Sequence, residues 1–187
     1  MFLRDVFAKR IKDSRGDYTI EVSVNKMLAS SPSGKSTGKY ETPPYHNSLS
    51  WNMKAINSFS EISSIEFKTF RDLFLVEKLI MRKFKLKNPR QFGANALFAL
   101  ESAILKALAK EKKKELWQII NPDAKILPVP VGNVIEGGLH AHNKNRPDFQ
   151  EFLLIPQEKT FKEDYYLIRN IYDRIGLILR SKNRTDE

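Results

Sequence analysis

The sequence contains no cysteine, which excludes disulfide bonds, thiolate catalysis and cysteine metal sites. It also lacks any apolar run of the roughly 18 residues that a membrane-spanning helix needs. Charged residues fall within the first ten positions, so the N-terminal segment has no apolar core of the kind found in secretory signal peptides. From these absences we expect a cytoplasmic protein with no membrane segment.

Acidic residues are in the minority, since 32 lysines and arginines stand against 22 aspartates and glutamates and give a formal charge of +10. This balance favours anionic partners such as nucleic acid, an anionic membrane or phosphorylated metabolites. The densest basic run, residues 110–114, includes a glutamate and closes a helical pattern. Cations there suit the negative end of a helix dipole, so we interpret the run as a solvated helix end. Nucleic acid is therefore not the expected partner.

The 187 residues are enough for one domain, or for one domain and part of a second, and 41% of them are hydrophobic. Residues 2–11 and 17–27 are predicted to form a β-hairpin, because apolar and polar residues alternate along the second segment. The segment 29–38, rich in serine and glycine, is predicted to be an exposed loop.

Helices are predicted over 64–84, 92–112 and 114–120. The second of them is rich in alanine and leucine, and small side chains allow close packing, so it is expected to be the central buried helix. A boundary is predicted at residues 121–123, which divides the chain into domains 1–124 and 125–187. The overall class is α+β, with an antiparallel sheet and packed helices.

Beyond the boundary the pattern changes to short extended segments. Residues 126–135 are predicted to be an edge strand, because two prolines remove hydrogen-bond donors, and residues 149–155 a second strand. A last helix is predicted over 161–180. Its apolar stripe is formed by six residues spaced three and four apart, namely Phe161, Tyr165, Ile168, Tyr172, Ile175 and Leu179.

Two patterns suggest chemistry but are weak by themselves. Residues 29–36 fit a relaxed phosphate-loop pattern, yet a phosphate loop must open a helix, and the prolines at 43–44 prevent one. The histidines are the other candidates: His46 is interpreted as surface, and His140 and His142 follow paired glycines that let the backbone or a ligand approach closely. A structural histidine remains the first interpretation of that pair.

Glu151 is a more specific candidate. Strand alternation places it on the same face as Phe149, Leu153 and Ile155. A carboxylate on an apolar face is costly unless it is paired or has a function, and the alternative is an edge position open to water.

Taken together, ordered motifs along about residues 3–180 resemble the enolase (phosphopyruvate hydratase) family. They are the hairpin residues 13–16 and 19–22, the loop 32–41, the helix start 92–96, the segments 127–130, 133–135 and 137–138, and the segments 140–144 and 150–152. The resemblance implies an enolase N-terminal-like domain, followed by the first two strands and first helix of an incomplete β/α barrel.

The resemblance also implies a reaction, the reversible glycolytic dehydration of 2-phosphoglycerate to phosphoenolpyruvate with Mg²⁺. Ser36 would bind magnesium as the loop closes, and His140 would contact the substrate, although His142 could take its place. Gln150 and Glu151 would line the substrate pocket, with Glu151 near the leaving hydroxyl group.

The general acid, the lysine base and three magnesium-binding carboxylates of the family have no counterpart in these 187 residues. The chain alone is therefore expected to be inactive and to need a barrel-bearing C-terminal half or an enolase homologue as its partner. The alternative is a non-catalytic, truncated homologue that binds a protein partner or nucleic acid.

Overall fold

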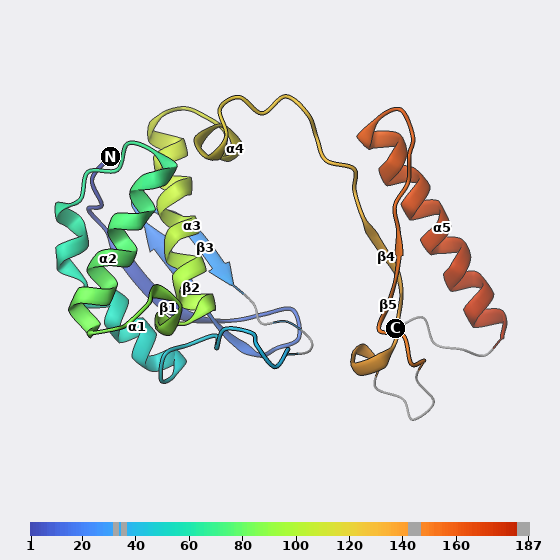
Figure 1. Cartoon of the computed structure of the whole chain (residues 1–187), viewed down its shortest axis with the longest axis horizontal. Helices are drawn as coiled ribbons and strands as arrows, with labels where there is room; N and C mark the ends of the chain where they lie inside the picture. Colours follow the sequence, from blue (N-terminus) through green and yellow to red (C-terminus); the bar gives the residue numbers. More distant parts are fainter. Residues whose placement is uncertain (32–33, 35–36, 142–146, 183–187) are drawn as a thin grey trace. The chain divides into compact units, whose positions relative to one another are not determined.

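The computed structural model describes the chain except for residues 32–33, 35–36, 142–146 and 183–187 (Figure 1). The chain divides into two compact units, Met1–Ala124 and Lys125–Glu187. The first combines a three-stranded antiparallel sheet with packed helices, and the second combines a two-stranded antiparallel hairpin with one long helix. The predicted α+β class is confirmed, and the described part of the second unit does not form a closed barrel.

The first sheet contains β1 (Val6–Lys12), β2 (Tyr18–Val24) and β3 (Met27–Ser31) in sequence order. The predicted hairpin between the first two strands is present, but the second strand ends at Val24, before its predicted end at residue 27. The chain instead reverses at Asn25 and Lys26, whose φ angles are +47° and +69°. Positive φ at both residues of a two-residue turn matches the twist of the flanking strands and produces a tight hairpin.

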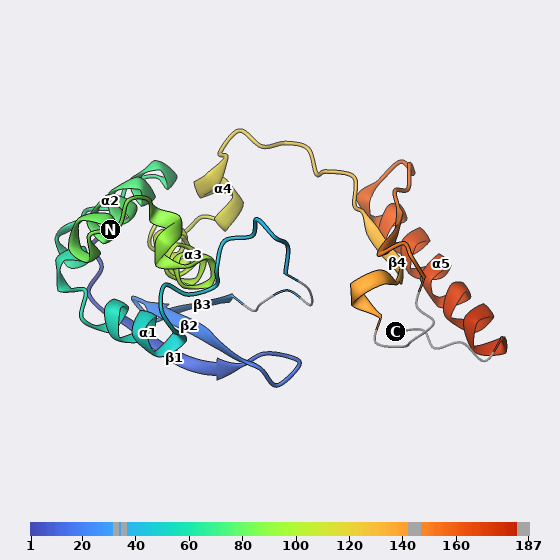
Figure 2. The same cartoon turned by 60° about the horizontal axis from the view of Figure 1, so that its bottom comes forward.

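The helical elements of the first unit cover one face of this sheet and its border. They are α1 (Leu49–Asn57), η1 (Ser60–Ser64), η2 (Phe70–Asp72), α2 (Leu73–Phe84), η3 (Pro89–Phe92), α3 (Ala94–Glu111) and α4 (Leu116–Ile120). Helix α3 packs against β2 and β3, as Figures 1 and 2 show, and the side chains of Leu100, Ile104 and Leu108 are fully buried. The prediction of a central buried helix is confirmed.

The long helix predicted over 64–84 begins later than expected. Phe67 lies in an extended segment and its N–H donates to the carbonyl of Met1 at 2.7 Å, so its apolar side chain is buried outside any helix. Thr69 and Asp72 form a capping box at the N-terminus of η2, the short 3₁₀ helix that leads into α2. Helix α1, which was not predicted from the sequence, is capped by Ser48, whose side chain accepts from Trp51 N–H.

The second unit contains β4 (Gly132–Glu136), η4 (Gly138–His140), β5 (Glu151–Leu154) and α5 (Phe161–Ser181). Only the last part of the predicted strand 126–135 is a β-strand. Helix α5 is present, and Ile168 packs against Gly132 of β4. The predicted stripe is partly wrong, because Tyr165 and Tyr172 are exposed, whereas Asp164 is buried and accepts from the N–H of Glu158 at 2.9 Å.

A pocket of about 460 Å³ between α2 and α3 contains two carboxylates, Glu77 and Glu101, together with Arg71 and apolar side chains. No described residue hydrogen-bonds Oε1 of Glu101, which has almost no exposed surface. Burial, and secondarily the negative charge of Glu77, raises the pKa of Glu101 to about 7. The carboxyl group is therefore held partly protonated near neutral pH.

This shift predicts a pH-dependent stability. Between pH 4.5, the ordinary pKa, and about 7, the folded state binds more protons than the unfolded chain, so the free energy of unfolding falls as the pH rises through this window. For a carboxyl group that retains some exposure, the loss is roughly 2 kcal/mol. In urea titrations at several pH values, Glu101→Gln is expected to remove this slope, whereas Asp17→Asn, at an exposed turn, keeps it. An unchanged slope in Glu101→Gln would contradict the assignment.

Candidate functional site

The first candidate site lies where β4 and β5 pair. Their ladder joins Gly132 to Leu154 and Asn133 to Leu153, and then shifts so that Glu136 lies opposite Glu151. The shift is a β-bulge at Val134, and bulges redirect the side chains that follow them. Two carboxylates are thereby placed directly across the ladder, a pairing that is unfavourable unless a cation or a functional group lies nearby.

His140 is that neighbouring group. Its Nδ1 lies 3.6 Å from Oε1 of Glu151 and 3.9 Å from Oε1 of Glu136. The imidazole side chain is 12% exposed, whereas the two carboxylates are 39% and 32% exposed. The structure thus brings together two predicted site residues, His140 and Glu151, and adds Glu136, which the sequence analysis missed. A protonated imidazole would form ion pairs with both carboxylates at these distances.

The paired glycines at 137–138 allow another backbone segment to approach closely, and that segment is residues 147–150 of the same chain. The N–H of Gly137 donates to the carbonyl of Gln150, and the N–H of Gly138 donates to the carbonyl of Pro147, both at 2.9 Å. Gly138 has a φ of +52°, and a Cβ atom there would lie 3.1 Å from Cα of Gln150. These contacts hold Gln150 beside His140 through the backbone, while the Gln150 residue itself is exposed.

Glu151 is less enclosed than its sequence neighbours suggested. Leu153 and Ile155, expected to share its face, are 55% and 59% exposed, and Phe149 is 71% exposed. In the described chain the carboxylate therefore does not carry the cost of burial in an apolar surface.

The other two predicted residues, Ser36 and the alternative His142, lie outside the described residues. The structure does describe the segment that follows the loop, residues 37–46. The carbonyls of Pro43 and Pro44 accept hydrogen bonds from Ala94 and Asn95 at 2.9 and 3.1 Å. These donors are among the first N–H groups of α3, which have no partner within their own helix. The C-terminal end of the loop is therefore fixed on the N-terminus of the central helix.

His46 extends this attachment. Its Nδ1 lies 2.7 Å from the carbonyl of Gln91, so Nδ1 carries the donated proton, and its ring contacts Trp51 with centroids 4.6 Å apart. Its backbone N–H donates to Asn52, and Asn52 in turn donates to the carbonyl of Phe92 at 2.7 Å. The sequence alone predicts that His46 is plain surface. The histidine is exposed, but it joins residues 45 positions apart in the sequence.

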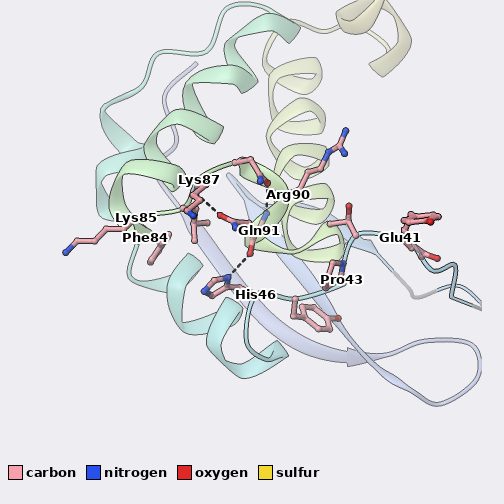
Figure 3. Close-up of a pocket in the computed structure, with 13 residues that line it drawn as sticks. Glu41, Pro43, His46, Phe84, Lys85, Lys87, Arg90 and Gln91 are labelled. Carbon is pink, nitrogen blue, oxygen red and sulfur yellow. Dashed lines mark hydrogen bonds between the residues drawn. The ribbon is translucent and has the colours of Figure 1, made fainter.

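A pocket of about 690 Å³ opens beside this attachment, between residues 40–46 and 84–91 (Figure 3). Lys85, Lys87 and Arg90 line it together with Glu41, but in Figure 3 the side chain of Lys85 points away from Gln91 and the ring of His46. The cations do not converge on one point. The arrangement is therefore better suited to holding the end of the loop than to binding a small anion.

The described residues do not by themselves form a metal site. Within them, no three or more histidine, aspartate or glutamate side chains are grouped so that they could hold a metal ion. His140, Glu136 and Glu151 therefore do not make a magnesium site on the evidence of their own geometry. Among the described helices, none is both long and apolar enough to cross a bilayer.

Each of the two units matches the model of a known protein family. Residues 3–120 match the family model of the enolase N-terminal domain, and residues 124–187 match that of the enolase C-terminal TIM barrel domain. The first match covers most of the chain, and the two matches follow each other in order. The chain belongs to the enolase family, and its class is that of the enolase-type lyases.

Proposed function

We propose that the chain is part of a phosphopyruvate hydratase, which dehydrates 2-phosphoglycerate to phosphoenolpyruvate in the cytoplasm. The observation that carries the proposal is the ordered match of both units to the two domains of enolase. The net charge of +10 also suits this strongly anionic substrate, because a cationic protein attracts it.

The proposal assigns the substrate-binding roles to His140, Gln150 and Glu151. The reaction removes a proton next to a carboxylate and then a hydroxyl group, and the leaving hydroxyl needs a proton or a hydrogen-bond donor. Glu151, 3.6 Å from His140, is assigned to the side of the leaving hydroxyl, and His140 to a contact with the substrate. Gln150, adjacent on the chain and exposed, would supply a neutral amide to the same pocket.

Magnesium would supply the positive charge that stabilises an enediolate formed next to a carboxylate. Ser36 is the residue of this chain that we assign to it. The described residues contain no group of three or more metal-binding side chains, and we assign the remaining ligands to the barrel-bearing partner.

The proposed partner is a barrel-bearing enolase half. A complete β/α barrel contains eight strands, and the described part of the second unit contains a hairpin and one helix. Its apolar side chains are available for such a partner, since Phe149, Leu177 and Ile178 are 71%, 63% and 55% exposed. Exposed apolar surface of this extent is typical of a protein–protein interface. The same exposure favours the second candidate function, a non-catalytic protein that binds a partner.

The experiment that separates the two functions follows the absorbance of phosphoenolpyruvate formed from 2-phosphoglycerate and magnesium. The chain is assayed alone, then with a separately folded enolase barrel half, and the barrel half is assayed alone as the control. We expect turnover in the mixture and none above background in either part. If the two halves form a complex, shown by gel filtration, and the complex has no activity, the lyase proposal is wrong and the binding function stands.

A further inference from the structure

A groove of about 480 Å³ lies at the C-terminal end of α3, between the segment leading into α2 and helix α4. Its volume is in the range of ligand-binding pockets. All the charged side chains that line it are cationic, namely Lys68, Arg71, Lys112 and Lys114. The concentration of one charge sign around a concave surface attracts an anionic ligand.

Three of these cations have no anionic partner among the described residues. Lys68 forms an ion pair with Glu66 at 2.9 Å, and this pair raises the pKa of Lys68. No described carboxylate forms an ion pair with Arg71, Lys112 or Lys114. Most of the positive charge in the groove is therefore available to an external ligand.

The rest of the groove is largely apolar. Phe70 and Ile120 line it and are 40% and 47% exposed, and Ile119 and Pro122 complete the apolar surface. Transfer of an apolar side chain from water onto such a surface is favourable. The groove thus combines an apolar surface from η2 and α4 with cations from two separate segments, 68–71 and 112–114.

Hydrogen bonds hold both cationic segments in place. On one side, Asp72 accepts from the N–H groups of Lys68 and Thr69 at 2.7 and 2.8 Å. On the other side, the N–H of Lys114 donates to the carbonyl of Ala109 at 3.0 Å and closes the turn that ends α3. A groove whose walls are already fixed loses less conformational entropy when a ligand binds.

We propose that this groove binds an acidic peptide segment of a partner protein, in which carboxylates flank one large apolar side chain. A lone phosphate would leave the apolar surface of Phe70, Ile119 and Ile120 uncovered. Single-stranded nucleic acid would need several aromatic surfaces for stacking, but Phe70 is the single aromatic side chain among the lining residues, and the others of the apolar surface are aliphatic. A peptide of this kind offers both the negative charge and the apolar side chain that the groove can bind.

Lys112 and Lys114 are the most informative positions for a test. Arg71 also lines the neighbouring pocket that contains Glu77 and Glu101, so its replacement would change both pockets. Lys112 and Lys114 follow α3 and form no ion pair with a carboxylate of the described chain.

The test uses the full 187-residue chain and fluorescence anisotropy of the labelled peptide acetyl-Asp-Glu-Phe-Asp-Glu-amide. The double variant Lys112→Glu with Lys114→Glu is expected to weaken binding roughly tenfold or more, because two attractive charges become repulsive. The matched control, Lys12→Glu with Lys54→Glu, makes the same change in net charge at exposed lysines of the first unit that do not line the groove and is expected to retain most of the affinity. Thermal unfolding of each variant checks that it is folded.

A second measurement needs no protein variant. Replacing the phenylalanine of the peptide by serine leaves its charge unchanged and is expected to weaken binding by about tenfold, through loss of the apolar contact. Equal affinity for the two peptides, or equal losses in the two double variants, would overturn the proposal. Tighter binding of an oligothymidylate or of inorganic phosphate that depends on Lys112 and Lys114 would also overturn it, and would assign the groove to the corresponding anion.

Discussion

Replacement of Glu151 by glutamine is expected to lower the turnover of 2-phosphoglycerate by about 10²–10³-fold, the range typical of removing one group that stabilises developing charge at the reacting centre. The assay is the one in which an enolase barrel half is mixed with this chain. Glutamine keeps the size and hydrogen-bonding capacity of the side chain, but it removes the carboxylate whose Oε1 lies 3.6 Å from Nδ1 of His140. The effect should therefore fall on kcat more than on KM.

Glu151 is 39% exposed and pairs with Glu136 in the β4–β5 ladder, so its replacement should leave the fold intact. Surface substitutions of this kind usually change stability by less than about 0.5 kcal/mol. Unchanged unfolding by circular dichroism would show that any loss of turnover is chemical. Glu158→Gln makes the same chemical change at an exposed residue elsewhere in the second unit and serves as the matched control.

A loss of turnover in Glu151→Gln could come from a lost contact with His140 or from a lost contact with the substrate, and Glu136→Gln distinguishes the two. Both Glu136 and Glu151 lie within 4 Å of His140, at 3.9 and 3.6 Å, so either substitution removes a negative charge from beside the imidazole. If Glu151 acts only through its contact with His140, the two variants should lose similar activity. If Glu151 itself meets the substrate, its variant should lose far more. Unchanged turnover in Glu151→Gln would remove that residue from the site.

The parts of the fold that the sequence predicted correctly are those determined by continuous local patterns. Helix α3 follows from a long run of alanine and leucine, and β2 from strict alternation of apolar and polar residues. The turn at Asn25 and Lys26 was missed because its second residue is a lysine, and such turns most often have glycine there. Phe67 has helical spacing but is buried by an extended segment that bonds to Met1, which is a long-range contact.

The candidate site also depends on contacts that local sequence patterns do not reveal. His140 and Glu151 were identified by residue type and motif, but the proximity of Glu136 depends on the β-bulge in β4. A bulge changes which residues face each other without changing the composition of either strand. In the same way, the contact of His46 with Gln91 depends on packing between segments far apart in the sequence. Neither contact could be predicted from local periodicity.

The second large effect is expected at Gly93, where the segment that follows the loop meets the central helix. Gly93 has a φ of +102°, and a Cβ atom there would lie 2.7 Å from the carbonyl oxygen of Pro44 and 2.8 Å from the carbonyl carbon of Tyr45. These are backbone atoms and cannot rotate away. Gly93→Ala should therefore lower the free energy of unfolding by roughly 3 kcal/mol or more, the sum of backbone strain and a steric clash.

Gly16→Ala is the matched control, because it introduces the backbone strain of a positive φ without a steric clash. Gly16 has a comparable φ of +84°, but a Cβ atom there would meet nothing within 4 Å. Its replacement should cost only the strain, about 1 kcal/mol. Urea titrations of both variants measure the difference, and equal losses would show that the contact with residues 44–45 is not what requires glycine at position 93. A larger loss at Gly93 would show that the close packing of residues 44–45 against the start of α3 requires glycine at position 93.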